Sequence, residues 1–267
     1  MTVLDVPVIS TVELTSSRAS PLLVVGPSLG TSVRELWGEV AALLTDQFHV
    51  LGWELPGHGT NRSVSEHAAS MSSIAQGVVT AVDRFLAVNG LAHPRFAYAG
   101  DSVGGAVGLH LLLEHRPRIS GAILACTGAR LGDTASWRER AHLVAGQGTE
   151  VVVEGSLQRW FGPGFTQRRP DITDTFTRRL LEVNPVGYAQ VCHALAGFDV
   201  TDRLAEIAAP VLAIAGDQDR PTPVPLLREI AEGVQDGHLA VLPGVGHLAP
   251  VEAPESVADL AIVHLSA

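Results

Sequence analysis

The sequence predicts a protein of the α/β class, in which helices cover a mainly parallel β-sheet. Short apolar runs alternate along the chain with longer stretches of helical periodicity, the pattern of repeated strand–helix units. Several of the short runs are almost continuously hydrophobic, as expected for strands whose two faces are both covered by helices. The chain has 267 residues, of which 46% are hydrophobic and 17% charged. One domain with a large core is therefore expected, and a disordered chain is excluded.

The individual elements follow from this alternation. Strands are predicted for the short apolar runs at residues 22–26, 49–53, 96–99, 121–126, 211–215 and 239–242. Helices are predicted where apolar residues recur at helical spacing, at residues 33–45, 71–88, 103–114, 224–233 and 254–264.

The middle of the chain has a different pattern. Apart from an ambiguous run at 151–153, strand-like segments stop between residues 128 and 196, and the pattern becomes helical and amphipathic. Because the strand–helix alternation resumes at Val211, residues 128–196 are expected to be a helical cap inserted into one core made of residues 1–127 and 197–267. Ligands of α/β sheets bind at strand ends, which favours a lid over an active site. A helical excursion without function is the alternative.

The composition excludes several classes of function. The formal net charge is −10 and no long arginine cluster occurs, so nucleic acid is not an expected partner. Two cysteines are too few for a disulfide scaffold or a cysteine-built zinc module. All 18 basic residues are arginine, which excludes a lysine nucleophile. The first residues do not resemble a signal peptide, and no apolar segment approaches the roughly 20 residues of a membrane helix. A cytoplasmic protein without a membrane partner is therefore expected.

One segment has the pattern of a serine nucleophile. Gly100-Asp101-Ser102-Val103-Gly104 fits G-x-S-x-G and stands between a predicted strand and a predicted helix. Ser102 therefore falls on a sharp turn at a helix N-terminus, where the flanking glycines leave room for close backbone approach. A glycine-rich turn with an idle serine is the alternative, and partners further along the chain favour the nucleophile.

Those partners are an acid and a histidine, since a serine hydroxyl needs a base and the base needs an orienting carboxylate. After the predicted strand 211–215, Asp219 stands at the favoured position for the acid, with Asp217 as the alternative. Of the 11 histidines, only His247 follows the last predicted strand and precedes the final helix. The order serine, acid, histidine is the one expected on an α/β sheet.

The tetrahedral intermediate of such a reaction needs two backbone donors for its oxyanion. One is expected to be the amide of Val103, directly after the nucleophile. The other is expected from the turn after strand 22–26, with Leu29 as the chosen residue. A simple tight turn is the plain interpretation of this segment, and it is compatible with the functional one because a tight turn aims the N–H.

With these motifs the chain resembles the α/β-hydrolase superfamily over essentially its whole length, and more narrowly the 3-oxoadipate enol-lactonases of bacterial aromatic-acid breakdown. The narrower resemblance rests on motifs in the oxyanion turn, the elbow, the cap and the last loop: Ser28-Leu29-Gly30-Thr31, Gly57-His58-Gly59, the glycines of residues 100–105, Arg159-Trp160-Phe161-Gly162-Pro163, Phe198-Asp199, and the ending from Leu242-Pro243-Gly244 to His247-Leu248-Ala249 with Val251-Glu252. The resemblance implies an eight-stranded, mostly parallel sheet flanked by helices, with the cap inserted after the sixth strand.

The resemblance also implies a reaction. Ser102 would open the ring of an enol-lactone through an acyl-serine intermediate, and no metal or organic cofactor is required. The substrate is a small anionic lactone, so its carboxylate needs a cation beside an apolar wall. Trp137 and Arg140 match a tryptophan and an arginine of the family's lid, and Trp160 is a second wall candidate. The alternative is that Arg140 only solvates the surface of a lid helix. This alternative applies more strongly to its neighbour Arg138.

Two further functions share these residues. A carboxylesterase or cofactor-free perhydrolase would use the same three catalytic groups and differ in substrate. A non-catalytic ligand-binding protein of the same fold would retain the groups without turnover. The sequence does not determine the oligomeric state.

Overall fold

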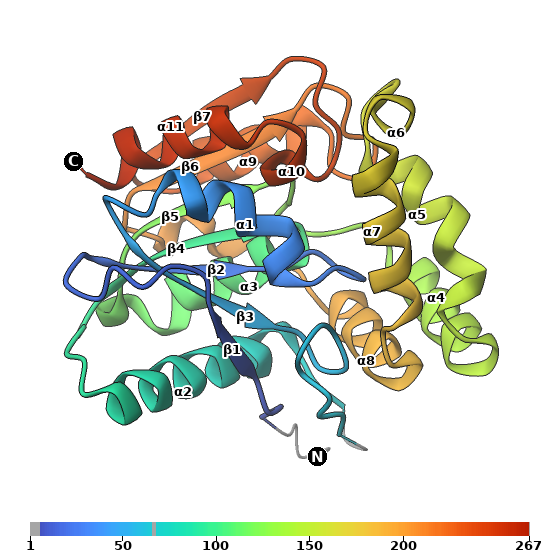
Figure 1. Cartoon of the computed structure of the whole chain (residues 1–267), viewed down its shortest axis with the longest axis horizontal. Helices are drawn as coiled ribbons and strands as arrows, with labels where there is room; N and C mark the ends of the chain where they lie inside the picture. Colours follow the sequence, from blue (N-terminus) through green and yellow to red (C-terminus); the bar gives the residue numbers. More distant parts are fainter. Residues whose placement is uncertain (1–5, 66–67, 267) are drawn as a thin grey trace.

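One seven-stranded sheet runs through the centre of the molecule (Figure 1). The computed structural model describes residues 6–65 and 68–266. The strand order is β1-β3-β2-β4-β5-β6-β7, and every neighbouring pair is parallel except β1 with β3. The strands are β1 (Ser10–Glu13), β2 (Leu22–Gly26), β3 (His49–Glu54), β4 (Phe96–Asp101), β5 (Ile119–Ala125), β6 (Val211–Gly216) and β7 (Gly237–Leu242). The α/β class is therefore confirmed, and the predicted strands and helices lie within two residues of the observed bounds.

Two details of the expected sheet are corrected. The described residues contain seven strands rather than eight, and the cap follows the fifth of them, β5, rather than the sixth. The strand β1 was not predicted from the sequence, and only its Val12 is fully buried. This strand lies at the edge of the sheet, so it does not need the continuous apolar run by which the inner strands are recognised. Residues 1–5 lie outside the described residues.

The helices lie on the two faces that the strand order dictates. The chain moves along the sheet in one direction from β2 to β3 and in the other direction from β3 onward. Because parallel crossovers are right-handed, α1 (Val33–Leu43) covers one face, whereas α2 (Met71–Asn89), α3 (Val103–Glu114) and α9 (Val224–Gly233) cover the other. The final helix, α11 (Pro254–Leu265), packs beside α1. Both faces are thus closed, and the central strands β2, β3, β4 and β6 are buried along their whole length.

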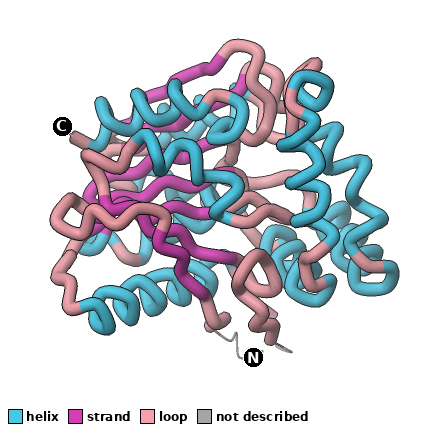
Figure 2. Tube along the Cα trace, in the orientation of Figure 1, coloured by secondary structure: helices cyan, strands magenta, loops and turns pink. Residues whose placement is uncertain are grey.

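The segment between β5 and β6 is helical and lies beyond the end of the sheet to which the strand arrows point (Figure 1). Figure 2 shows only helix and loop in it, and the ambiguous run at 151–153 is helical. Its two connections to the sheet lie side by side, because Arg130 forms an isolated bridge with Asp199 and Val200 N donates to Ala129 O at 2.9 Å. The α-helices of this cap are α4 (Thr134–Gln147), α5 (Val153–Trp160), α6 (Phe165–Arg168), α7 (Pro170–Leu181) and α8 (Pro185–Ala196).

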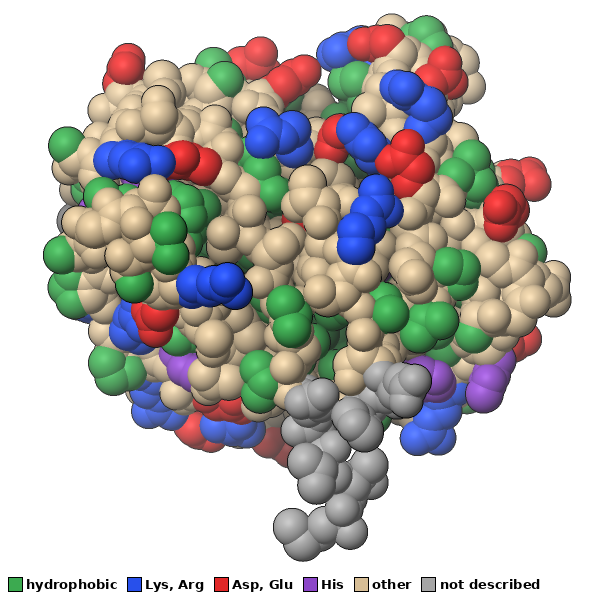
Figure 3. All heavy atoms as spheres, turned by 60° about the horizontal axis from the view of Figure 1, so that its bottom comes forward, with side chains coloured by type: hydrophobic (Ala, Val, Ile, Leu, Met, Phe, Trp, Pro, Cys, Tyr) green, Lys and Arg blue, Asp and Glu red, His purple; other side chains and the backbone are tan. Residues whose placement is uncertain are grey.

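The surface carries mixed charge. On the face shown in Figure 3, arginine and acidic side chains are interspersed rather than gathered into patches of one sign. Several arginines form ion pairs with carboxylates, as Arg179 does with Glu35 at 2.7 Å and Arg116 with Glu206 at 2.8 Å. None of the described helices combines the length and the hydropathy needed to cross a bilayer.

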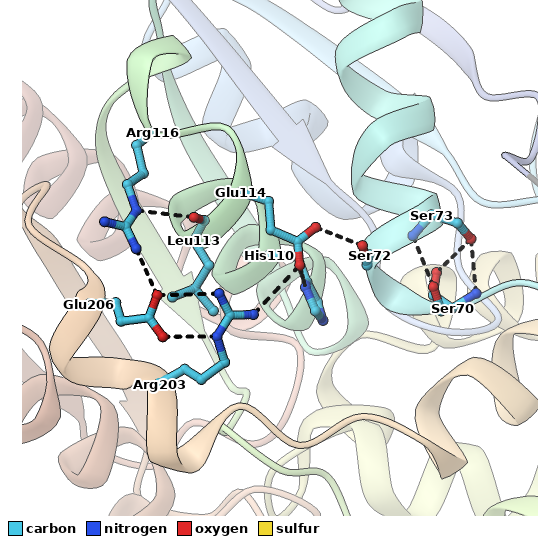
Figure 4. Close-up of polar contacts among 9 residues, drawn as sticks. All are labelled: Ser70, Ser72, Ser73, His110, Leu113, Glu114, Arg116, Arg203 and Glu206. Carbon is cyan, nitrogen blue, oxygen red and sulfur yellow. Dashed lines mark hydrogen bonds and ion pairs between the residues drawn. The ribbon is translucent and has the colours of Figure 1, made fainter. Parts of the chain in front are cut away.

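A polar network joins the core helices to the chain that returns from the cap (Figure 4). Glu114, at the end of α3, accepts hydrogen bonds from Ser72 of α2 at 2.6 Å and from His110 at 2.8 Å. Arg203, in the 3₁₀ helix η3 (Thr201–Glu206), pairs with Glu114 at 3.7 Å and with Glu206 at 3.0 Å. Because these groups are partly or fully exposed, water screens each pair, and the contribution of the network to stability is small.

The close packing of α3 on the sheet can be tested with two helical glycines. A Cβ at Gly108 of α3 would lie 2.7 Å from both Leu124 Cδ2 and Tyr98 Cε1, whereas a Cβ at Gly38 of α1 would meet no atom within 4 Å. We expect Gly108→Ala to destabilise the fold by about 1–3 kcal/mol through overpacking. Gly38→Ala is expected to stabilise it by up to about 1 kcal/mol because alanine favours helix. Urea unfolding of both variants measures the difference, and equal stabilities would contradict the packing described here.

Candidate active site

Ser102 occupies the turn between β4 and α3 in a backbone conformation that few residues adopt. Its φ is +54° and its ψ is −112°. The turn is held from both sides, since Ser102 N donates to Ala125 O at 2.9 Å and Thr127 Oγ1 donates to Ser102 O at 2.7 Å. A non-glycine residue at positive φ costs about 1–3 kcal/mol and persists only where the surroundings enforce it. The strain therefore marks Ser102 as a residue whose side-chain direction matters.

Two glycines make this turn possible. A Cβ at Gly100 would lie 2.3 Å from Gly104 O, and a Cβ at Gly104 would lie 2.8 Å from Pro27 O. Gly104 N also donates to Pro27 O at 2.9 Å. The first turn of α3 is thus pressed against the loop after β2, which brings Ser102 close to the segment expected to hold the oxyanion.

The structure brings together the three side chains that the sequence order suggested. Ser102 Oγ lies 2.9 Å from His247 Nε2, and His247 Nδ1 lies 2.9 Å from Asp219 Oδ2 and 3.1 Å from Asp219 Oδ1. The three residues follow β4, β7 and β6 at the carboxyl edge of the sheet. Parallel strands end at the same edge, so residues more than 100 positions apart in the chain meet there. This arrangement is able to activate a hydroxyl as a nucleophile.

The alternative acid, Asp217, lies elsewhere. Its Oδ1 accepts a hydrogen bond from Gly244 N at 2.7 Å, and the residue is exposed. Asp219 is buried, and Thr222 donates to it from the backbone N at 2.9 Å and from Oγ1 at 2.5 Å. Burial by itself would raise the pKa of Asp219, but the charge and hydrogen bond of His247 and the Thr222 donors hold that pKa below its ordinary value. Asp219 is therefore an ionised acceptor for the Nδ1–H of His247.

Two backbone amides beside Ser102 have no hydrogen-bond acceptor among the described residues. One is that of Val103, the first residue of α3, whose N–H points out of the helix N-terminus. The other is that of Leu29, in the turn where Thr31 N donates to Ser28 O at 3.2 Å and Gly30 has a φ of +84°. Unpaired amides in buried positions are rare, so both are available to an oxygen that the protein itself does not supply.

A cavity of about 240 Å³ opens over Ser102 and His247, and its walls come from both the core and the cap. Trp137, Arg140 and Trp160, which the sequence suggested as substrate contacts, all line it. Ser28 and Arg159 also line the cavity, although neither was predicted from the sequence to contact the substrate. The signal for Arg159 was its position directly before Trp160, at the end of α5.

The two cavity arginines differ from those on the surface. Arg140 Nη2 donates to Ser156 Oγ at 3.2 Å, and its guanidinium lies 5.8 Å from the Trp137 ring and 5.5 Å from the Tyr188 ring. Its buried Nε has no hydrogen-bond partner within residues 6–65 and 68–266. Neither Arg140 nor Arg159 is within ion-pair distance of a carboxylate of the described residues. Burial, and then repulsion by Arg140, lower the pKa of Arg159.

These cations make the cavity suitable for an anion. Asp133 is the acid among the residues that line the cavity, and its carboxylate already accepts hydrogen bonds from Ser136 N at 2.9 Å and Ser136 Oγ at 2.6 Å at the start of α4. Two unneutralised guanidinium groups near each other attract a carboxylate, which would relieve their mutual repulsion. No group of three His, Cys, Asp or Glu side chains in the described ranges is arranged to hold a metal ion.

Comparisons with known proteins find similarity over most of this chain. A family model described as serine aminopeptidase, S33, matches residues 29–254. The chain is 32% identical to 3-oxoadipate enol-lactonase 2 of Acinetobacter baylyi over 236 residues, which cover 88% of this chain and 85% of that protein. Its fold matches the crystal structure of an enol-lactonase from Burkholderia xenovorans, with a TM-score of 0.89 at 24% identity over 97% of this chain and 96% of that one. It also matches a hydrolase from Pseudomonas aeruginosa, with a TM-score of 0.87 at 29% identity over 97% and 94% of the two chains.

Proposed function

Because the chain belongs to the α/β-hydrolase family described as serine aminopeptidase, S33, and resembles family members that cleave esters and lactones, we propose that it opens the ring of 3-oxoadipate enol-lactone to give 3-oxoadipate. In this proposal Ser102 is the nucleophile, His247 the base and Asp219 its orienting acid. The reaction belongs to the bacterial breakdown of aromatic acids and takes place in the cytoplasm without a metal or an organic cofactor.

One observation supports the anionic substrate above all others. The cavity over Ser102 and His247 contains Arg140 and Arg159, and neither has an acid partner among the described residues. A neutral ester would leave these charges uncompensated, whereas a lactone with its own carboxylate would pair with one of them. The indole walls of Trp137 and Trp160 suit the flat, apolar part of an enol-lactone ring.

The reaction follows from the placement of the groups. Ser102 Oγ bonds to the lactone carbonyl carbon while His247 Nε2 takes the hydroxyl proton. The amides of Leu29 and Val103 donate to the carbonyl oxygen as it becomes negative. Collapse of this intermediate breaks the ring C–O bond and releases an enolate oxygen, which His247 protonates. Water, deprotonated by His247, then attacks the acyl carbon and restores Ser102. The enol released relaxes to the 3-oxo acid.

Substrate turnover and one arginine variant test the proposal together. Loss of the ultraviolet absorbance of the enol-lactone measures ring opening by the wild type. We expect Arg140→Ala to raise KM for this anionic lactone by about tenfold to a hundredfold, because a charge-assisted hydrogen bond contributes about 1.5–3 kcal/mol. Hydrolysis of p-nitrophenyl acetate, which carries no charge, is expected to change little.

The matched control is Arg138→Ala, which removes an exposed arginine of the same helix that does not line the cavity. This variant is expected to keep the wild-type KM for both substrates. Equal losses of Arg140→Ala on the lactone and the ester would contradict the role of Arg140. If the wild type did not turn over the lactone, this substrate would be rejected. The natural substrate would then be a different ester or lactone.

A further inference from the structure

Glu252 joins two segments that are far apart in the chain. It is the last residue of the short helix α10 (Ala249–Glu252), which follows the loop of His247. Its Oε1 accepts a hydrogen bond from Gly246 N at 2.9 Å, and its Oε2 accepts one from Gly162 N at 2.9 Å. Gly246 directly precedes His247, and Gly162 lies in the cap two residues after Trp160. One carboxylate thus spans the loop that carries the histidine and the cap segment that carries the cavity wall.

The same two segments are in direct backbone contact. The N–H groups of His247 and Leu248 both donate to Trp160 O, at 2.9 and 3.1 Å. There is no space between the segments, since a Cβ at Gly246 would lie 2.5 Å from Gly162 N and a Cβ at Gly162 would lie 2.6 Å from Gly244 O. A small displacement of either segment therefore moves the other.

We propose that Glu252 is a positioning residue that couples the cap to the histidine loop, so that the His247 ring and the Trp160 wall take their working positions together. The proposal rests on the proposed function only in assigning His247 as the base of a serine hydrolase. Glu252 itself does not line the cavity and is not expected to touch the substrate.

The two hydrogen bonds require an ionised carboxylate. A carboxylate accepts at both oxygens, whereas a protonated carboxyl has an O–H that faces one of the two amide N–H groups. Burial raises the pKa of Glu252 to about 7, with Asp219 adding to the rise, while the two amides and Arg168 of α6 oppose it. Asp101, at the end of β4, also faces this region, and burial followed by repulsion from Asp219 and Glu252 raises its pKa well above the ordinary value. Below neutral pH, Glu252 therefore takes up a proton and gives up one of its acceptor positions.

The pH profiles of the wild type and of Glu252→Gln, with p-nitrophenyl acetate as substrate, are the first test. The ratio of the two kcat/KM values isolates the Glu252 carboxyl, because the other titrating groups of the site are the same in both proteins. We expect this ratio to be constant well above pH 7 and to fall toward one at lower pH, as Glu252 takes up its proton in the wild type. A ratio that does not change with pH would overturn the proposal.

The second test uses Glu252→Gln, with Glu255→Gln as the matched control. A carboxamide accepts at its oxygen but presents an NH₂ group to the second amide, so the coupling is half lost at every pH. We expect kcat for the ester to fall by about tenfold to a hundredfold at a pH well above 7, where the wild-type carboxylate is ionised. Glu255→Gln, at an exposed position of α11, is expected to give the wild-type rate at every pH. Wild-type kcat in Glu252→Gln at a pH well above 7 would refute the role of Glu252.

Two measurements separate this role from a loss of folding and from the substrate proposal. Stoichiometric labelling of Ser102 by an organophosphate counts the folded sites, and rates are expressed per labelled site. The ester assay does not depend on the natural substrate. If the wild type fails to open the enol-lactone but Glu252→Gln still lowers the ester rate in a pH-dependent way, the substrate proposal fails and the positioning role stands.

Discussion

Replacement of Ser102 by alanine is expected to reduce kcat by about four to six orders of magnitude on every substrate that the protein hydrolyses. The loss is this large because Ser102 supplies the nucleophile at the basic nitrogen. Among the described residues, Ser102 Oγ lies 2.9 Å from His247 Nε2, whereas the Thr222 hydroxyl lies 3.2 Å from the other ring nitrogen, Nδ1, and donates to Asp219. Residual hydrolysis would come from the cavity and the two amides acting on water. Initial rates with the enol-lactone and with p-nitrophenyl acetate measure the effect.

The control for this variant is Ser120→Ala, at an exposed serine near the start of β5 and therefore at the opposite end of the strand from the cavity. It is expected to hydrolyse both substrates at the wild-type rate. Ser102→Ala is also expected to fold normally. If it retained more than about one per cent of the wild-type kcat, the role of Ser102 as nucleophile would be wrong.

Replacement of Asp219 by asparagine is expected to reduce kcat by about three to four orders of magnitude. The carboxylate accepts the Nδ1–H of His247, which leaves Nε2 free to take the proton of Ser102. An asparagine NH₂ group would donate to Nδ1 instead and so favour the tautomer with its proton on Nε2. That tautomer cannot act as the base, although the position of the ring is kept. The pre-steady-state release of p-nitrophenolate measures the acylation step directly.

Asp217→Asn is the matched control, because the two acids stand two positions apart in one loop. The Asp217 carboxylate accepts from Gly244 N, whereas the carboxylate at hydrogen-bond distance from His247 is that of Asp219. Its side-chain oxygen is retained in asparagine, so kcat is expected to stay within about twofold of the wild type. Equal losses in the two variants would mean that the loop as a whole, and not the Asp219 carboxylate, supports the reaction.

The elements predicted from the sequence correspond closely to the structure where the local pattern is strong. The strand β2 and the helices α3 and α9 have the predicted bounds, since long apolar runs and helical periodicity are properties of neighbouring residues. The failure was β1, in which the four residues Ser-Thr-Val-Glu bury only Val12 fully. Such a strand is stabilised by its pairing with β3 and not by its own composition.

The residues of the candidate site also differ in how well the sequence predicted them. Ser102 and His247 were recognisable because each follows a strand in a distinctive glycine-containing turn. The cap was recognised as a helical segment, and Trp137, Arg140 and Trp160 were proposed in it on family resemblance alone. Arg159 was overlooked as a cavity residue, because a helical pattern does not tell which side of a short amphipathic helix faces a cavity and which faces solvent.

The sequence by itself determined the class of fold, the order of the strands from β2 to β7 with the core helices between them, and the two turns that carry the serine and the histidine. Only the tertiary structure decided that Asp219 rather than Asp217 contacts His247, that Arg140 and Arg159 share one cavity with no acid partner in the described part of the chain, and that Glu252 ties Gly246 to Gly162. The physical reason is that secondary structure follows from short-range patterns. Contacts between residues that lie 28 to 145 positions apart depend instead on how the strands pair and on the direction in which each loop side chain points.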